Sequence, residues 1–229
     1  MSEEIKNMFA DISGNYDYMN NVISLGNHHL WRKKLVKISG AEEGQSVLDC
    51  ASGTGDLAIE FKKAVGTEGK VLATDFCFDM LEYLPPKAKK KGYDIDIEIA
   101  DAMNLEYEDD SFDYAGISFG IRNVDNPDIA LKEMARVVKP GGKVMILETG
   151  KPKGAFKYLY NFYNRRIFPL LGSIIAKKKD AYTYLPNSID KFPYAEEFVK
   201  LMKDTGKYID VKYYPQFFGV SYIYEGTVK

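Results

Sequence analysis

The chain has 229 residues, a length that predicts one domain, and its 45% hydrophobic and 28% charged residues are typical of a globular protein. Its net charge of −2 does not indicate a nucleic-acid binder. No apolar run reaches the roughly 18 residues of a membrane-spanning helix, and the acidic start at Met1–Glu4 has no apolar stretch behind it to indicate a signal peptide. The two cysteines, Cys50 and Cys77, form no CxxC pair, so we expect neither a metal site nor a disulfide, and we expect a cytoplasmic location.

Residues 1–40 predict helices that precede the core of the fold. Apolar residues recur at helical spacing near the start, at Ile5, Met8, Phe9 and Ile12. Further along, both histidines and the only tryptophan fall together between Leu25 and Arg32. Adjacent histidines such as His28 and His29 cannot share one helical face, so this pair does not predict a metal site. The simplest interpretation of the segment is a helix cap with a packed Trp31.

The stretch from Ser46 to Ala58 predicts a strand, a tight glycine turn and a helix. A short apolar run ends in two glycines separated by one residue, Gly53 and Gly55, and a helical pattern then resumes. We expect the strand over 46–51 and the helix over 55–65. Glycines let a ligand approach the bare backbone, and the start of the helix presents unpaired N–H groups and the positive end of its dipole. These features indicate a nucleotide-like ligand.

Two cofactors are compatible with this turn. Gly53-x-Gly55-x-x-Ala58, followed by Asp75 at the end of the next strand, satisfies the fingerprint of an NAD-dependent oxidoreductase. Asp49 argues otherwise, because a buried parallel strand is normally apolar and a carboxylate there needs N–H partners or a place at the ligand crevice. The pattern V-L-D-x-x-x-G-x-G resembles the glycine loop of Rossmann-like S-adenosylmethionine-dependent methyltransferases. That resemblance implies that Asp49 orients the loop near the methionine end of the cofactor, and that Asp75 binds the ribose hydroxyls.

Strands and helices alternate regularly from residue 44 onward. Four further strands of the core are expected over 70–75, 95–100, 112–118 and 143–148. The helices between them are expected over 78–91 and 127–138, and Pro85-Pro86 predicts a break within the first of these. The chain closes with a helix over 194–204 and two strands over 208–216 and 218–228.

These elements predict an α/β fold: a Rossmann-like, seven-stranded, mostly parallel sheet with a C-terminal antiparallel hairpin and helices on both faces. Such a hairpin is expected of the methyltransferase class, whereas a dehydrogenase would continue with further βαβ units. We predict one domain over 1–229. Its parts are an N-terminal helical cap at 1–43, a cofactor-binding core at 44–150, a helical substrate lid at 151–192, and the last helix with the closing strands at 193–229.

Ligands of open parallel sheets bind beyond the carboxyl ends of the strands, which selects the residues that end the predicted strands. Three acidic residues occupy such positions, namely Asp49, Asp75 and Asp101. Each alone could be a turn former or a helix cap, but together they predict a cofactor site whose acidic rim suits a sulfonium cation. We expect Asp101 at the adenine amino group, and Thr54 and Ser118 along the pocket wall. The predicted cofactor-binding set is Asp49, Gly53, Thr54, Gly55, Asp75, Asp101, Ala102 and Ser118.

Several longer segments carry a closer resemblance. They are Gly53-Thr54-Gly55-Asp56-Leu57, Phe119-Gly120-Ile121-Arg122-Asn123, Lys139-Pro140-Gly141-Gly142, Tyr184-Leu185-Pro186-Asn187-Ser188-Ile189, and the opening run from Tyr16-Asp17-Tyr18-Met19-Asn20-Asn21 to Leu25-Gly26-x-His28-x-x-Trp31-Arg32. In these segments the chain resembles the ubiquinone/menaquinone-biosynthesis C-methyltransferases over essentially its whole length. The resemblance implies that the protein uses S-adenosylmethionine to methylate a ring carbon of a polyprenylated quinol. Among such quinols, demethylmenaquinol is the first candidate for the substrate. A methyltransferase of this fold acting on another small molecule or lipid is the first alternative.

The chemistry implied by the resemblance needs no metal. A quinol hydroxyl loses its proton, and the charge delocalises onto the ring carbon that attacks the sulfonium methyl. Arg122 and Asn123 are predicted to stabilise the phenolate or to position a water that takes its proton. The alternative for the arginine is an ion pair with Asp101 or Asp125. Residues of the N-terminal helices are expected to close over the quinol, so the predicted catalytic set is Arg122, Asn123, Tyr16 and His28.

The aromatic and basic segment 154–179 has three interpretations. Pro169 and Gly172 divide it into two helical pieces that pack as a lid, form a groove for the isoprenoid tail, or touch an anionic membrane surface. The basic residues available for that contact are Arg165, Arg166 and Lys177 to Lys179. Besides this peripheral contact at the inner face of the membrane we consider a homodimer, and we expect no nucleic-acid partner.

Overall fold

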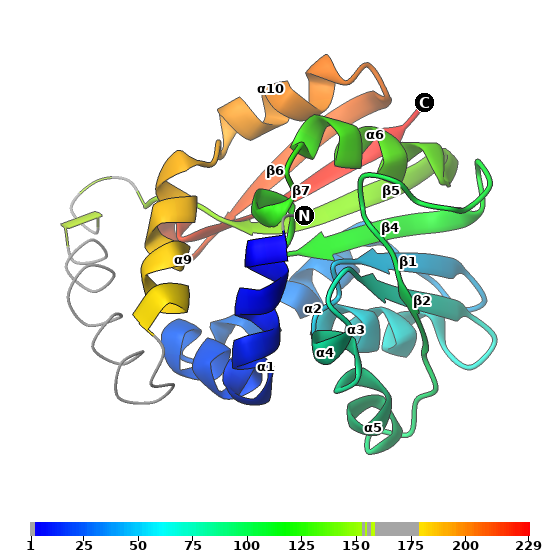
Figure 1. The fold of residues 1–229 in the computed structure, drawn as a ribbon. Helices are drawn as coiled ribbons and strands as arrows, with labels where there is room; N and C mark the ends of the chain where they lie inside the picture. The colour runs from blue at the N-terminus through cyan, green and yellow to red at the C-terminus, as the bar shows by residue number, and fades with distance from the viewer. Residues whose placement is uncertain (1–2, 153, 155–156, 159–178) are drawn as a thin grey trace.

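The computed structural model describes residues 3–152, 154, 157–158 and 179–229. Among them seven strands form one sheet: β1 (Ser46–Cys50), β2 (Lys70–Asp75), β3 (Asp96–Ile99), β4 (Phe112–Ser118), β5 (Val138–Thr149), β6 (Tyr208–Gln216) and β7 (Ser221–Val228). The strand order is β3-β2-β1-β4-β5-β7-β6 (Figure 1). Neighbouring strands among β1 to β5 are parallel, whereas β7 runs antiparallel to β5 and β6. The predicted mostly parallel sheet with a closing hairpin is therefore confirmed.

Helices cover both faces of this sheet, as Figure 1 shows. They are α1 (Glu3–Ser24), α2 (Asn27–Ser39), α3 (Asp56–Val65), α4 (Phe78–Leu81), α5 (Leu84–Lys89), α6 (Pro127–Arg136), α9 (Lys179–Lys191) and α10 (Glu196–Asp204). One buried apolar cluster joins α6 and α10 to the sheet through Met134 and Phe198. A second cluster joins α2 and α3 to the sheet through Leu35 and Phe61. Because the central strands are covered from both sides, their sequences are nearly continuous apolar runs.

The helix predicted over 78–91 is interrupted, as its two prolines indicated. α4 ends at Leu81, and α5 begins at Leu84 with Pro85 and Pro86 in its first turn. A proline is tolerated there because the N–H groups of a first helical turn have no partner within the helix.

The strand predicted over 143–148 starts earlier than expected, because β5 begins at Val138. The segment 139–142, which the sequence predicts as a turn, is an irregularity within this strand where the pairing with β4 shifts register. Gly142 permits the close approach of β5 to β4, since a Cβ there would lie 2.5 Å from the carbonyl oxygen of Asp113. The prediction was wrong because glycine and proline were read as strand breakers without regard to the neighbouring strand.

The carboxyl ends of β1 and β4 mark the point where the strand order reverses. β1 pairs with β2 on one side and with β4 on the other, so the chain leaves these two strands in opposite directions. Ligands of open α/β sheets bind in the crevice that forms there. α9 reaches this edge and contacts both α1 and the short 3-10 helix η1 (Ile121–Asn123). The two helical pieces predicted over 154–179 lie outside the described residues.

Candidate functional site

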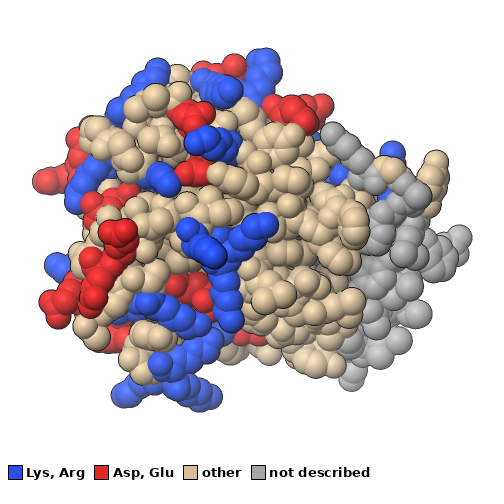
Figure 2. All heavy atoms as spheres, turned by 180° about the vertical axis from the view of Figure 1, so that it is seen from behind, with Lys and Arg blue, Asp and Glu red and all other residues tan. Residues whose placement is uncertain are grey.

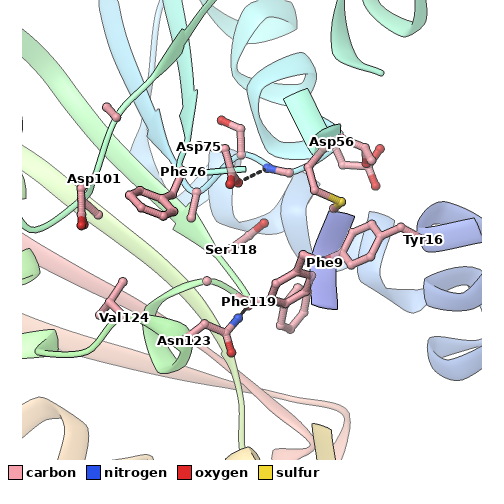
Figure 3. A pocket seen from close by; sticks show the side chains of 18 of the residues that line it. Phe9, Tyr16, Asp56, Asp75, Phe76, Asp101, Ser118, Phe119, Asn123 and Val124 are labelled. Atoms are coloured by element: carbon pink, nitrogen blue, oxygen red, sulfur yellow. Dashed lines mark hydrogen bonds between the residues drawn. The ribbon is translucent and has the colours of Figure 1, made fainter. Parts of the chain in front are cut away.

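A cavity opens at the carboxyl ends of β1, β2 and β4, where the strand order reverses (Figure 3). Its wall contains most of the predicted site residues, namely Tyr16, Gly53, Thr54, Asp75, Asp101, Ala102, Ser118 and Asn123. The other predicted residues do not line it within the described part of the chain; they are Asp49, Gly55, His28 and Arg122. Residues from both N-terminal and central elements therefore meet at one ligand site.

The glycine loop between β1 and α3 forms one wall of the cavity. Ala51, Gly53 and Gly55 adopt the left-handed backbone conformation, with φ of 48°, 57° and 81°, which turns the chain sharply into the helix. Gly55 has no room for a side chain, because a Cβ there would lie 2.1 Å from Cδ1 of Leu84. Asp75 ties the loop to β2 by accepting a hydrogen bond from the backbone N–H of Gly53 at 2.8 Å. The loop is therefore held by packing on one side and by a hydrogen bond on the other.

Asp49 is a buried carboxyl group at the base of this loop. Its side chain is 0% exposed, and neither oxygen accepts a hydrogen bond from the described residues. Burial raises its pKa to about 7, because the ionised form loses the solvation of water. A cation in the neighbouring cavity would favour the ionised form. Asp49 itself does not line the cavity.

Asp75, which ends β2, and Asp101, which follows β3, lie on one side of the cavity together with Phe76 (Figure 3). Asp75 is 7% exposed, and burial raises its pKa. One of its oxygens accepts a hydrogen bond from the N–H of Cys77 at 2.8 Å, and Asp101 accepts one from the N–H of Met103 at 3.0 Å. This side of the cavity combines two carboxylates with an aromatic ring, which suits the hydroxyl groups and the base of a nucleoside.

The loop after β4 is braced by Arg122 and Asn123. Nη1 of Arg122 donates to Oε1 of Glu148 at 2.8 Å and to the carbonyl oxygen of Phe119 at 2.6 Å. This ion pair is buried, with the arginine and glutamate side chains 7% and 1% exposed. Nδ2 of Asn123 donates to the same carbonyl oxygen at 3.3 Å, and its Oδ1 accepts from the hydroxyl of Tyr184 at 3.1 Å. The amide of Asn123 is therefore fixed in the cavity wall.

The surroundings of Arg122 differ from the sequence prediction. The ion pair joins it to Glu148 of β5, rather than to the Asp101 or Asp125 that the sequence singled out. Since β4 and β5 are neighbours in the sheet, a residue just beyond β4 can meet one near the carboxyl end of β5. Its guanidinium is engaged there and does not line the cavity, so in this geometry Arg122 holds the loop, and its predicted role toward the substrate stays a prediction.

His28 also lies away from the position predicted for it. It is 2% exposed, its Nδ1 accepts from Nη1 of Arg32, and its Nε2 lies 3.3 Å from Oδ1 of Asn21. Burial lowers its pKa to about 4, so the ring is neutral and its Nδ1 is free to accept. His28 positions Arg32 and does not close over the cavity. Tyr16, by contrast, does line the cavity, as predicted (Figure 3).

One cluster within the described ranges has the residue types of a metal site. Ligand atoms of His28, His29 and Asp56 lie within 4.8 Å of one another, although adjacent histidines were expected to point apart. Their rings are only 3.8 Å apart because both turn toward Asn21. The carboxylate of Asp56 is already paired with two cations, because Nη1 of Arg32 lies 3.5 Å and Nζ of Lys87 lies 2.7 Å from its oxygens. This charge balance does not favour an added metal ion.

A network of charged groups ties α1 and α5 to the glycine loop. Oγ1 of Thr54 donates to Oδ1 of Asp17 at 2.5 Å. Nζ of Lys87 lies 2.6 Å from Oδ2 of Asp17 and 2.7 Å from Oδ1 of Asp56. Through these contacts α1 is held over the loop, with Phe9 and Tyr16 in the cavity wall. No sequence motif marks Lys87, whereas Asp17 lies inside the N-terminal motif.

Comparisons with known proteins agree with this geometry. A family model described as the ubiE/COQ5 methyltransferase family matches residues 1–228. A protein of Bdellovibrio bacteriovorus named Ubiquinone/menaquinone biosynthesis C-methyltransferase UbiE is 57% identical over 228 residues, which cover 99% of this chain and 97% of that protein. A Demethylmenaquinone methyltransferase of Staphylococcus aureus is 41% identical over 211 residues, which cover 92% of this chain and 87% of that protein.

The fold is also found in solved structures of low sequence identity. A SAM dependent methyltransferase from Aquifex aeolicus superposes with a TM-score of 0.66 at 20% identity, covering 93% of this chain and 98% of that one. At this identity the likeness concerns the fold alone.

Proposed function

The chain belongs to the ubiE/COQ5 methyltransferase family, and on this premise we propose that it methylates a ring carbon of a polyprenylated quinol. It is an S-adenosylmethionine-dependent methyltransferase. The names of its relatives support demethylmenaquinol as the substrate, with a precursor of ubiquinone as the alternative. The observation that carries the proposal is the cavity itself, where a side suited to a nucleoside adjoins a wall formed by Asn123, Phe9 and Tyr16 (Figure 3).

The residues of the cavity fit S-adenosylmethionine. Asp75 would hold the ribose hydroxyls, and Asp101 would face the adenine amino group beside Phe76 and Ala102. The carboxyl group of Asp49 has no hydrogen-bond partner among the described residues, so a nearby cation would stabilise its ionised form. The sulfonium group of this cofactor is such a cation. When bound, the cofactor supplies an electrophilic methyl group. We therefore propose that the predicted cofactor-binding residues bind S-adenosylmethionine.

Asn123 is the side chain that we assign to the quinol oxygen. One N–H of its amide is engaged with the backbone of Phe119, and its Oδ1 accepts from Tyr184. The second N–H is proposed to donate to the oxygen that loses its proton, directly or through a water, and thereby to stabilise the phenolate. Arg122 contributes by holding the loop in place, because its guanidinium donates to the same backbone carbonyl. A fixed donor stabilises developing charge more than a mobile one.

The N-terminal helix is proposed to shield the reacting groups from water. Phe9 and Tyr16 of α1 line the cavity, and Thr54 and Lys87 hold this helix against the glycine loop through Asp17. Excluding water strengthens the hydrogen bonds inside the site and keeps the quinol oriented for attack. The sequence predicted that residues of the helical cap at 1–43 close over the quinol, and exclusion of water is the effect that we propose for this closure.

We propose that the isoprenoid tail leaves the cavity toward the side of the molecule that carries α9. In the rear view of Figure 2, Lys, Arg, Asp and Glu side chains gather on the left, and the described surface between them and the grey atoms is mostly uncharged. An uncharged surface suits a tail or a bilayer better than a charged one. No described helix has the length and apolar character needed to cross a membrane. Peripheral membrane contact and a homodimer are part of this proposal.

The decisive experiment is methyl transfer in vitro. The purified protein is given methyl-labelled S-adenosylmethionine and either a short-chain demethylmenaquinol or a short-chain benzoquinol precursor, both kept reduced. We expect label on a ring carbon of the naphthoquinol, and an Asn123→Ala variant should lower turnover about 10- to 100-fold. A protein that binds the cofactor but labels neither quinol would contradict the substrate assignment. A thermal shift with NADH and none with S-adenosylmethionine would contradict the class.

A further inference from the structure

The cavity wall beside β4 contains a buried arginine with one uncommitted amino group. Arg32 of α2 is 4% exposed, and its Nε donates to Oγ of Ser118 at 3.1 Å. Its Nη1 faces His28 and lies 3.5 Å from Oδ2 of Asp56. Nη2 makes no hydrogen bond within the described residues. Among the described residues, only the carboxylate oxygens of Asp49 are both fully buried and without a partner. Nη2 has no partner there, so it is not fully buried, and the cavity that Arg32 lines gives it access to a ligand.

The charge of Arg32 is only partly balanced by its neighbours. Asp56 is the nearest carboxylate, but Lys87 approaches it more closely, at 2.7 Å against 3.5 Å. His28 is neutral, and the guanidinium lies over the ring of Phe119 at 5.3 Å from its centroid. A buried guanidinium with one free amino group is suited to bind an anion such as a carboxylate.

The strand order indicates which part of the cofactor lies beside Arg32. Asp101 follows β3 and Asp75 ends β2, and the next strands in the sheet are β1 and β4. A cofactor with its adenine at Asp101 and its ribose at Asp75 places its third part, the amino acid, at β1 and β4. Ser118 ends β4, and Arg32 is bonded to it.

We propose that Arg32 binds the carboxylate of the amino-acid part of S-adenosylmethionine through its Nη2 amino group, and that Ser118 and His28 hold the guanidinium in place. This inference rests on the proposed function, because it assumes that cofactor. Asp49, which is near enough for the charge of Arg32 to act on it, complements the ammonium group of the same amino acid by its charge. The two buried groups together match a zwitterion.

The test removes the carboxylate from the ligand and the guanidinium from the protein. Binding is measured by calorimetry for S-adenosylhomocysteine and for its decarboxylated analogue, S-adenosyl-3-thiopropylamine. Wild type should bind the analogue about 10- to 100-fold more weakly. Arg32→Gln should weaken S-adenosylhomocysteine by a similar factor and leave the analogue unchanged, and Arg32→Lys should lie between. Lys33→Gln removes an exposed cation from the same helix and should change neither affinity.

Several outcomes would overturn the inference. If Arg32→Gln weakens both ligands equally, the arginine is only structural, and if it weakens neither while turnover falls, the arginine serves the quinol instead. Where Arg32→Gln fails to fold, as judged by its thermal transition, the comparison of the two ligands with Arg32→Lys decides. A failure of the proposed function is distinct: wild type would then bind S-adenosylhomocysteine but label neither quinol, and the comparison of the two ligands would still decide the role of Arg32.

Discussion

At the scale of single residues, two buried arginines approach the end of β4 from different elements. Arg122 is paired with Glu148, and it also donates to the backbone of its own loop. Arg32 lies on the cavity side and keeps one amino group without a partner among the described residues. The same side-chain chemistry therefore supports the site in one case and is available to a ligand in the other.

Replacing Arg122 by alanine should destabilise the protein strongly. The change leaves Glu148 buried without its partner, which costs about 3–5 kcal/mol in the free energy of unfolding. Turnover should fall as well, because Asn123 loses the loop that holds it, while cofactor binding should be retained. Urea unfolding and steady-state rates measure the two effects.

The double variant Arg122→Ala/Glu148→Gln separates stability from catalysis. Removing the unpaired charge should restore part of the free energy of unfolding but not the turnover. If the single variant lost turnover with no loss of stability, Arg122 would contact the substrate as the sequence predicted.

At the scale of elements, the packing of the glycine loop against α5 decides whether the cofactor site forms. A methyl group at position 55 would meet Leu84 at 2.1 Å, and the φ of 81° there disfavours any side chain. Gly55→Ala should lower the free energy of unfolding by about 1–3 kcal/mol and weaken cofactor binding. Adding Leu84→Ala makes room, so the two changes together should cost less than their sum. Strict additivity in denaturant unfolding would show that the clash is unimportant.

The junction of α1 with the loop depends on Lys87, which bridges Asp17 and Asp56. Lys87→Met keeps the length of the side chain and removes its charge, leaving two carboxylates facing each other. We expect faster amide hydrogen exchange over residues 9–17 and faster dissociation of S-adenosylhomocysteine. Lys89→Met, at an exposed position of the same helix, is the matched control. Unchanged exchange in α1 would mean that apolar contacts alone hold this helix.

At the scale of the whole molecule, two buried groups give the stability opposite dependences on pH. Folded Asp49 keeps its proton up to about pH 7, against 3.8 for an ordinary aspartate, so its contribution is lost as pH rises through that window. Folded His28 resists protonation down to about pH 4, against 6.5 ordinarily, so its contribution is lost as pH falls. Between about pH 4 and 6.5 the two slopes, each about 1.4 kcal/mol per pH unit, largely cancel.

The variant Asp49→Asn should reveal this balance. Its free energy of unfolding should rise with pH between about 4 and 6.5, because the dependence from His28 is no longer opposed. Relative to wild type it should gain most near neutral pH, where Asp49 is ionised without a hydrogen bond. Parallel pH profiles of wild type and variant, measured by urea unfolding, would contradict the assignment. Weaker cofactor binding by the variant would show that this instability serves function.

Much of the whole architecture could be predicted because it depends on local patterns. Alternating apolar runs, glycines and helical spacing predicted each strand of the sheet to within a few residues, apart from the start of β5. The carboxyl-end rule then brought Asp75, Asp101 and Ser118 to one cavity, where the structure has them. These inferences need only the chain order and the periodicity of side chains.

The sequence by itself therefore determined the fold, the family and the residues at the strand ends. Only the tertiary structure decided how the charged side chains are paired. Arg122 and Glu148 are 26 residues apart, and Arg32 and Ser118 are 86 apart, so no local pattern connects them. Ion pairs and buried hydrogen bonds depend on distances of a few ångströms between distant segments, whereas secondary structure depends on neighbours along the chain. For this reason the contact between Arg32 and Ser118 could not be predicted, and Arg32 was not among the predicted site residues.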